Sequence, residues 1–117
     1  MLGLGVGVVI DRGMMLADGL FNSGGAEVVA RLHAFFSGHV QGVGFRWQAT
    51  QVAKGYCVSG WVKNLPDGRV ELLAEGESSE VKAFYAAVSE AMASYIREST
   101  HKLEKSTRSC QGFHIVS

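Results

Sequence analysis

Apolar and polar side chains alternate along residues 29–37, at the start of the most regular part of the chain. Such alternation predicts a β-strand with one apolar face, here formed by Ala30, Leu32, Ala34 and Phe36. A helix is predicted after the following glycine-rich stretch, and we expect Gly55 to end it in a left-handed conformation. The apolar face of this helix consists of Phe45, Ala49, Val52 and Ala53.

Residues 57–64 and 70–74 predict two antiparallel strands, because Pro66 and the Asp67-Gly68 pair between them favour a tight turn. A second helix follows, for which Ser78 or Ser79 is the expected N-cap. Its apolar stripe consists of Val81, Phe84, Tyr85, Val88 and Met92.

Two short strands are predicted near the C-terminal end, at residues 101–107 and 113–116. The order βαββαβ, with room for one extra strand, indicates an α+β, ferredoxin-like sandwich in which two helices cover one face of an antiparallel sheet. Residues 1–28 are Gly-rich and show no sustained period, so we expect an N-terminal extension, either a flexible tail or an extra strand at residues 4–10, before a domain at 29–117.

Composition fits one globular domain, since 47% of the 117 residues are hydrophobic and 19% are charged. Eleven basic residues balance eleven acidic ones, so no overall field would attract nucleic acid or a membrane surface. We therefore expect no nucleic-acid or membrane partner, and any anion site must be local. The first ten residues predict neither a signal peptide nor an anchor.

Cysteine and histidine residues indicate no metal site. Cys57 and Cys110 are too few and too far apart in sequence for a zinc site or a disulfide framework, which suits a cytoplasmic protein. The histidines outside the glycine-rich stretch lie on different predicted elements without ligand spacing. They are His33, His101 and His114.

The glycine-rich stretch from Gly38 to Arg46 has the composition of an anion-binding loop. Consecutive backbone N–H groups between a strand and a helix can surround a phosphate, and the helix dipole favours its charge. Arg46, in the first helical turn, could pair two phosphate oxygens. The alternative is a simple connecting turn with a solvated arginine, because neither a dinucleotide fingerprint nor a Walker loop is present.

Asn64 ends the strand before the predicted turn. Its amide can both donate and accept hydrogen bonds, so it could hold a water beside a bound phosphorus. Local chemistry alone favours a different role, in which Asn64 stabilises the turn.

Together, these two segments resemble the acylphosphatase family. Residues 38–46 are similar to its G-x-V-Q-G-V-x-F-R signature, and residues 60–76 to its second signature, G-W-V-x-N-x-x-x-G-x-V with a later glycine. The resemblance spans about residues 30–116 and implies hydrolysis of acyl phosphates to a carboxylate and inorganic phosphate, with no metal or organic cofactor. We expect a monomer whose partner is a small acyl phosphate.

By the same resemblance, Arg46 is the expected phosphoryl-binding side chain and Asn64 the residue that orients the attacking water. The backbone N–H groups expected to bind the phosphoryl oxygens belong to His39, Val40, Gln41, Gly42, Val43, Gly44 and Phe45. Trp47 and Trp61 are expected to be packing residues. The family plan also places the last strand beside the second, so Cys57 and Cys110 could approach each other.

An alternative from another class is a non-catalytic ferredoxin-like module that binds an anion or nucleic acid. An RNA-binding version should show aromatic side chains on the sheet and a basic stripe, and the sequence shows no clear basic stripe. Residues 92–100 depart from the family because they lack the usual Gly-Pro-rich entry to the next strand, so the strand boundaries between residues 99 and 112 stay open.

Overall fold

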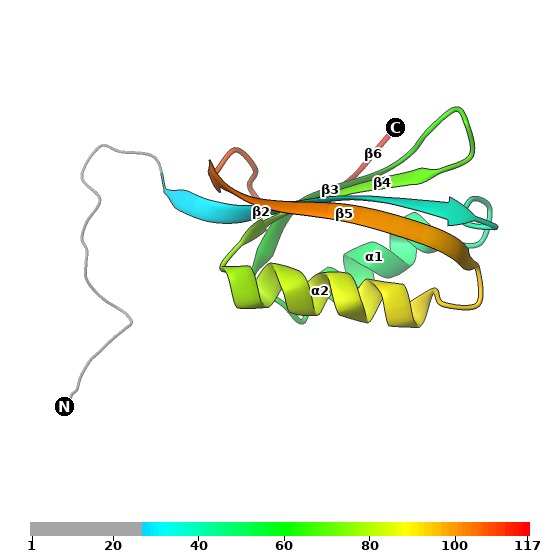
Figure 1. Ribbon diagram of the computed structural model, residues 1–117, viewed down its shortest axis with the longest axis horizontal. Coiled ribbons are helices and arrows are strands. Elements are labelled where there is room, and N and C mark those ends of the chain that lie inside the picture. The colour runs from blue at the N-terminus through cyan, green and yellow to red at the C-terminus, as the bar shows by residue number, and fades with distance from the viewer. Residues whose placement is uncertain (1–26) are drawn as a thin grey trace.

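The computed structural model describes residues 27–117, which form two helices and five strands (Figure 1). The predicted extra strand at residues 4–10, and nearly all of the predicted extension, lie outside the described residues. In chain order the elements are β2 (Val28–Gly38), α1 (Phe45–Ala53), β3 (Val58–Asn64), β4 (Val70–Gly76), α2 (Ser78–Ala91), β5 (Ile96–Thr107) and β6 (Phe113–Val116).

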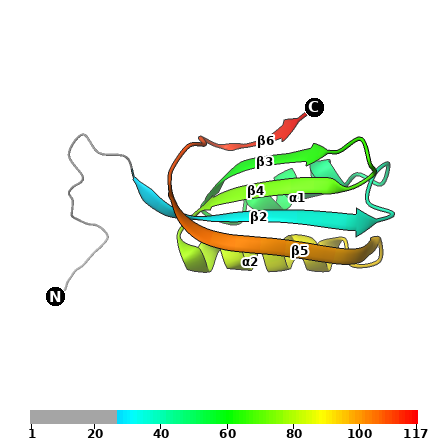
Figure 2. The same cartoon turned by 45° about the horizontal axis from the view of Figure 1, so that its top comes forward.

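The strands form one sheet in the order β5-β2-β4-β3-β6, and Figure 2 shows them side by side in this order. Neighbouring strands are antiparallel except β3 and β6, which run parallel. Both helices cover the same face of the sheet (Figure 1), so the predicted ferredoxin-like α+β fold is confirmed. No helix in residues 27–117 is long and apolar enough to cross a membrane.

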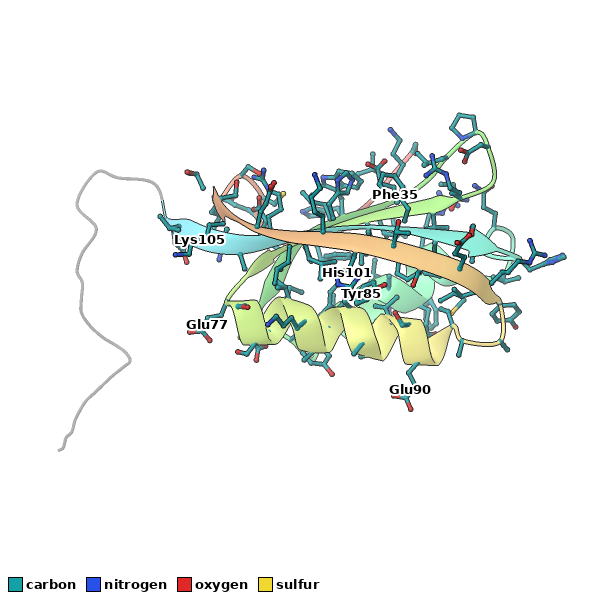
Figure 3. The ribbon with its side chains drawn as sticks, viewed as in Figure 1. Phe35, Glu77, Tyr85, Glu90, His101 and Lys105 are labelled. Carbon is teal, nitrogen blue, oxygen red and sulfur yellow. The ribbon has the colours of Figure 1, made fainter. Side chains whose placement is uncertain are left out.

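The core lies between the sheet and the two helices. Alternation along β2 buries Leu32, Ala34 and Phe36 on the helix-covered face, and β4 buries every second residue in the same way. Full burial of a side chain as large as those of Leu32 and Phe36 contributes about 1.5–3 kcal/mol. On the other face, Phe35 points away from the helices, whereas Tyr85 and His101 lie between α2 and the sheet (Figure 3).

The first helix ends differently from the sequence prediction. Gly55 was expected in a left-handed conformation, yet it is absent from the glycines with positive φ. Instead, α1 ends at Ala53, and the Lys54, Gly55 and Tyr56 N–H groups donate to carbonyls three residues earlier. This tight turn satisfies the last carbonyls of the helix, so no left-handed residue is required.

The second helix and the following strand also differ from prediction. The N-cap of α2 is Glu77, with extended backbone and no capping hydrogen bond from its side chain, and Ser78 is already helical. The strand predicted at residues 101–107 begins at Ile96, because β5 pairs with β2 from there up to Thr107. Most of β5 is exposed and polar, so backbone pairing rather than an apolar pattern defines its start.

A connection of five residues, 108–112, crosses from β5 to β6 and is held by one buried carboxylate. Glu75 is fully buried, and its Oε2 accepts a hydrogen bond of 2.7 Å from Arg31 Nη2. The Ser109 and Cys110 N–H groups donate to its Oε1 at 2.9 and 3.0 Å. Burial alone would raise the pKa of Glu75, but these hydrogen bonds outweigh it and lower the pKa to about 2.

We expect Glu75→Gln to lower the free energy of unfolding by about 3 kcal/mol at pH 7, because it leaves a half-buried Arg31 without its charge partner. The pKa is lowered on folding, so the stabilisation is complete above pH 4.5 and is lost as pH falls toward 2. Urea unfolding from pH 7 down to pH 2.5 should therefore show the two proteins converging.

The matched control is Glu90→Gln, since Glu90 is exposed on α2 and points away from the sheet (Figure 3). It removes the same charge and should change stability by less than about 0.5 kcal/mol. A Glu75→Gln effect that stayed constant with pH would contradict an ionised Glu75 as the anchor.

Candidate active site

The predicted anion-binding loop connects the end of β2 to the start of α1 at one end of the sheet (Figure 2). Gly42 and Gly44 have φ angles of 77° and 80°, a left-handed conformation that favours glycine. A Cβ atom at either position would meet no other atom within 4 Å, so the backbone conformation, not space, requires glycine. Gly44 is also the N-cap of α1.

The backbone N–H groups of residues 40–47 donate to no acceptor within residues 27–117. The first helical bond of α1 comes later, from Gln48 N to Gly44 O, and no acidic residue lies in the first turn. A run of unpaired N–H groups at the positive end of a helix is the arrangement that binds phosphate.

His39 is the exception among the predicted phosphate-binding residues. Its N–H donates to the Tyr95 carbonyl at 2.9 Å, in the turn before β5. This donor is thus engaged within the described fold, whereas the N–H groups of the other predicted residues are unpaired there: Val40, Gln41, Gly42, Val43, Gly44 and Phe45.

Arg46 lies directly after the loop, in the first turn of α1, and is half-buried. Its guanidinium forms no ion pair and no hydrogen bond with any residue that the structure describes. Three other arginines have carboxylate partners: Arg31 pairs with Glu75, Arg69 with Asp67 and Arg108 with Glu27. A partly buried, unpaired guanidinium beside free N–H groups is suited to bind an anion.

Asn64 is the last residue of β3 and lines the same cavity, of about 220 Å³, as Arg46 and the two loop glycines. Its Oδ1 is buried and accepts no hydrogen bond from the described residues. The local prediction that Asn64 stabilises the turn is wrong, because other bonds hold that turn. They are Leu65 N to Arg69 O, Gly68 N to Leu65 O and Arg69 N to Asp67 Oδ1.

The Gln41 side chain connects the loop to the turn after Asn64. Its Nε2 donates to the carbonyls of Leu65 and Arg69, at 2.7 and 2.9 Å. The two segments that the sequence singled out are thus fixed to each other. The glutamine was predicted only as a backbone donor, and its side-chain role depends on a contact that the sequence pattern does not reveal.

Two hydrophobic residues complete the cavity wall, and neither was predicted there. Trp47 was expected to be a packing residue but is 60% exposed. Ile115 on β6 pairs with Val62 of the parallel strand β3, and Val62 lies two residues before Asn64. This pairing is the signal that could have placed Ile115 near the site. Trp61, by contrast, is half-buried with its ring centroid 6.4 Å from that of His33, as expected for packing.

Three other features of the described residues were considered as functional sites: a second cavity, a possible metal site and the two cysteines. A larger one, of about 810 Å³, lies at the opposite end of the sheet, near the start of β2 and of α2, away from the glycine-rich loop. Within residues 27–117, no three His, Cys, Asp or Glu side chains are grouped as a metal site would require. Cys57 and Cys110 are free thiols, and their predicted proximity stays a prediction.

Comparison with known proteins identifies similar chains. The model of the acylphosphatase family matches residues 32–115. An acylphosphatase from Roseiflexus sp. (strain RS-1) is 44% identical over 92 residues, which cover 75% of this chain and 96% of that protein. An acylphosphatase from Pseudomonas paraeruginosa is 56% identical over 52 residues, but this match covers only 57% of its length.

Among solved structures, the crystal structure of acylphosphatase from Bacillus subtilis superposes with a TM-score of 0.70 at 35% identity. It covers 75% of this chain and 99% of that one. The similarity thus includes both the sequence around the loop and the arrangement of the sheet and helices that positions it.

Proposed function

This chain belongs to the acylphosphatase family and so hydrolyses acyl phosphates to a carboxylate and inorganic phosphate, and we propose that Arg46 and Asn64 carry out this reaction. The supporting observation is that one cavity brings together unpaired donors and an unpaired acceptor. The donors are the loop N–H groups and the Arg46 guanidinium, and the acceptor is Asn64 Oδ1.

In this proposal the loop and Arg46 bind the phosphoryl oxygens. Negative charge spreads over these oxygens in the transition state, and preorganised N–H groups stabilise it without reorganisation. The N-terminus of α1 adds its partial positive charge at the same place. In this proposal, the same groups bind the phosphoryl group and stabilise the negative charge of the transition state.

Asn64 is the proposed positioning group for water. Its buried Oδ1 accepts a hydrogen bond from the attacking water, whose lone pair then faces phosphorus. The water forms the new P–O bond while the bond to the acyl oxygen breaks, and the carboxylate leaves with the electron pair. A carboxylate is a good leaving group and needs no strong general acid.

The proton of the water passes to a phosphoryl oxygen of the substrate. No side chain is needed for this transfer, and Arg46 is the one ionisable residue among the described residues that line the cavity. We therefore propose a reaction that uses neither a metal ion nor an organic cofactor, because Arg46 and the helix supply the positive charge.

The nucleic-acid alternative is not favoured. Aromatic side chains do occur on the open face of the sheet, where Phe35 and His33 have ring centroids 4.9 Å apart. However, that face also carries carboxylates: Glu75 binds Arg31, and Glu71 is hydrogen-bonded to His33. Carboxylates at these positions do not suit a phosphate backbone. We propose a monomeric enzyme without nucleic-acid or membrane partners, and its two free thiols support a cytoplasmic location.

The test is release of inorganic phosphate from benzoyl phosphate by the purified protein in the presence of EDTA. We expect release far above the spontaneous rate, with competitive inhibition by inorganic phosphate. Release at the spontaneous rate would contradict the proposed reaction, and activity that required an added metal ion would contradict its metal-free form.

A further inference from the structure

Trp47 occupies an unusual position for a large apolar side chain. Tryptophan is mostly well buried in folded proteins, yet Trp47 is 60% exposed. The core contacts of α1 come instead from Phe45, Ala49 and Ala53. The indole ring is therefore free to contact a ligand in the cavity that it lines with Arg46.

Ile115 forms a second exposed apolar surface on the same cavity. It is 46% exposed and belongs to β6, the strand at the edge of the sheet. Trp47 and Ile115 come from different elements and are separated by most of the domain in sequence. Their position beside Asn64 and Arg46 gives the phosphate cavity an apolar border.

The charge of the cavity limits what can lie against this border. Arg46 is the one ionisable group among the described lining residues, and the phosphoryl group neutralises it. With the phosphoryl oxygens bound to the loop in the proposed complex, Trp47 and Ile115 are the exposed apolar side chains of the lining that an acyl group can contact. A second carboxylate there would lose hydration without gaining a cationic partner, whereas an apolar group would gain buried contact.

We propose that Trp47 and Ile115 form an acyl-binding subsite, and that the preferred substrates are acyl phosphates with an uncharged aromatic or branched apolar acyl group. The inference rests on the proposed hydrolysis of acyl phosphates. An aromatic acyl group can stack on the indole, and a branched one can pack against Ile115.

The test compares kcat/KM for benzoyl phosphate and acetyl phosphate in the wild type, Trp47→Ala and Ile115→Ala. We expect the wild type to prefer benzoyl phosphate, and this preference to fall about tenfold in Trp47→Ala and several-fold in Ile115→Ala. Trp47→Phe should retain most of the preference, because an aromatic ring remains. Inhibition by inorganic phosphate should change by less than about twofold, since the phosphate cradle is intact.

Leu103→Ala is the matched control for Ile115→Ala. Leu103 is also exposed, but on β5, the opposite edge of the sheet, and it lines the distant cavity. Leu103→Ala should leave kcat/KM unchanged for both benzoyl phosphate and acetyl phosphate. If the wild type hydrolyses both substrates and neither alanine variant changes their ratio, the acyl subsite is wrong while the proposed function stands. If the wild type hydrolyses neither, the proposed function itself fails.

Discussion

Arg46→Ala is expected to lower kcat/KM for acyl phosphates by about 10³-fold or more and to abolish inhibition by inorganic phosphate. The guanidinium forms no hydrogen bond or ion pair within residues 27–117, so its removal breaks no such bond in the described fold. In the proposed complex, both substrate and product phosphate lose the one charged side chain among the described residues that line the cavity. Steady-state kinetics with benzoyl phosphate and phosphate inhibition would measure the two effects.

Two further variants separate the geometry of Arg46 from its charge. Arg46→Lys keeps the charge without the planar fork, so we expect phosphate binding to recover more than turnover. Arg97→Ala removes a positive charge from exposed β5 and should change kcat/KM by less than about twofold. A mutant Arg46→Ala that still bound phosphate normally would show that the loop N–H groups alone form the site.

Asn64→Ala is expected to lower kcat by about 10²- to 10³-fold while the inhibition constant of inorganic phosphate changes by less than about twofold. The reason is that the amide contacts the water and not the phosphoryl group in the proposed complex. Normal turnover by this variant would contradict the water-orienting role.

The stability of Asn64→Ala gives an independent readout. Oδ1 is buried without a partner in the described residues, and an unsatisfied buried carbonyl costs about 1–3 kcal/mol. Removing it should leave the free energy of unfolding unchanged or raised, although activity is lost. Urea unfolding of the two proteins would measure this, and a large loss of stability would indicate that Asn64 supports the fold instead.

Much of the fold was predictable because its strongest signals are local. Alternation in β2 and β4 and the helical stripe of α2 identified the buried faces before any contact was known. β5 was predicted too short, since an exposed edge strand has no apolar period to mark its start and is defined by pairing with β2. The predicted end of α1 at Gly55 and the predicted start of α2 at Ser78 or Ser79 were wrong. At both places, backbone hydrogen bonds satisfy the terminal groups of the helix that these residues were expected to satisfy.

The site was predictable in part for a similar reason. The loop glycines and Arg46 lie close together in sequence, and Asn64 belongs to a second dense motif, so the pattern identifies them. Ile115 comes from a short strand with no motif of its own, and its place depends on parallel pairing with β3. The engaged N–H of His39 depends on Tyr95, more than fifty residues away in sequence, which no local pattern can show.

The cavity combines parts with different structural constraints. The predicted anion-binding loop is fixed by its left-handed glycines and by the Gln41 contacts, so few substitutions there are compatible with the backbone. Trp47 and Ile115 are exposed and lie outside the core, where most substitutions change stability by less than about 0.5 kcal/mol. We therefore expect that substrate range can drift during evolution, or be redesigned, through these two positions while the proposed catalytic residues stay unchanged.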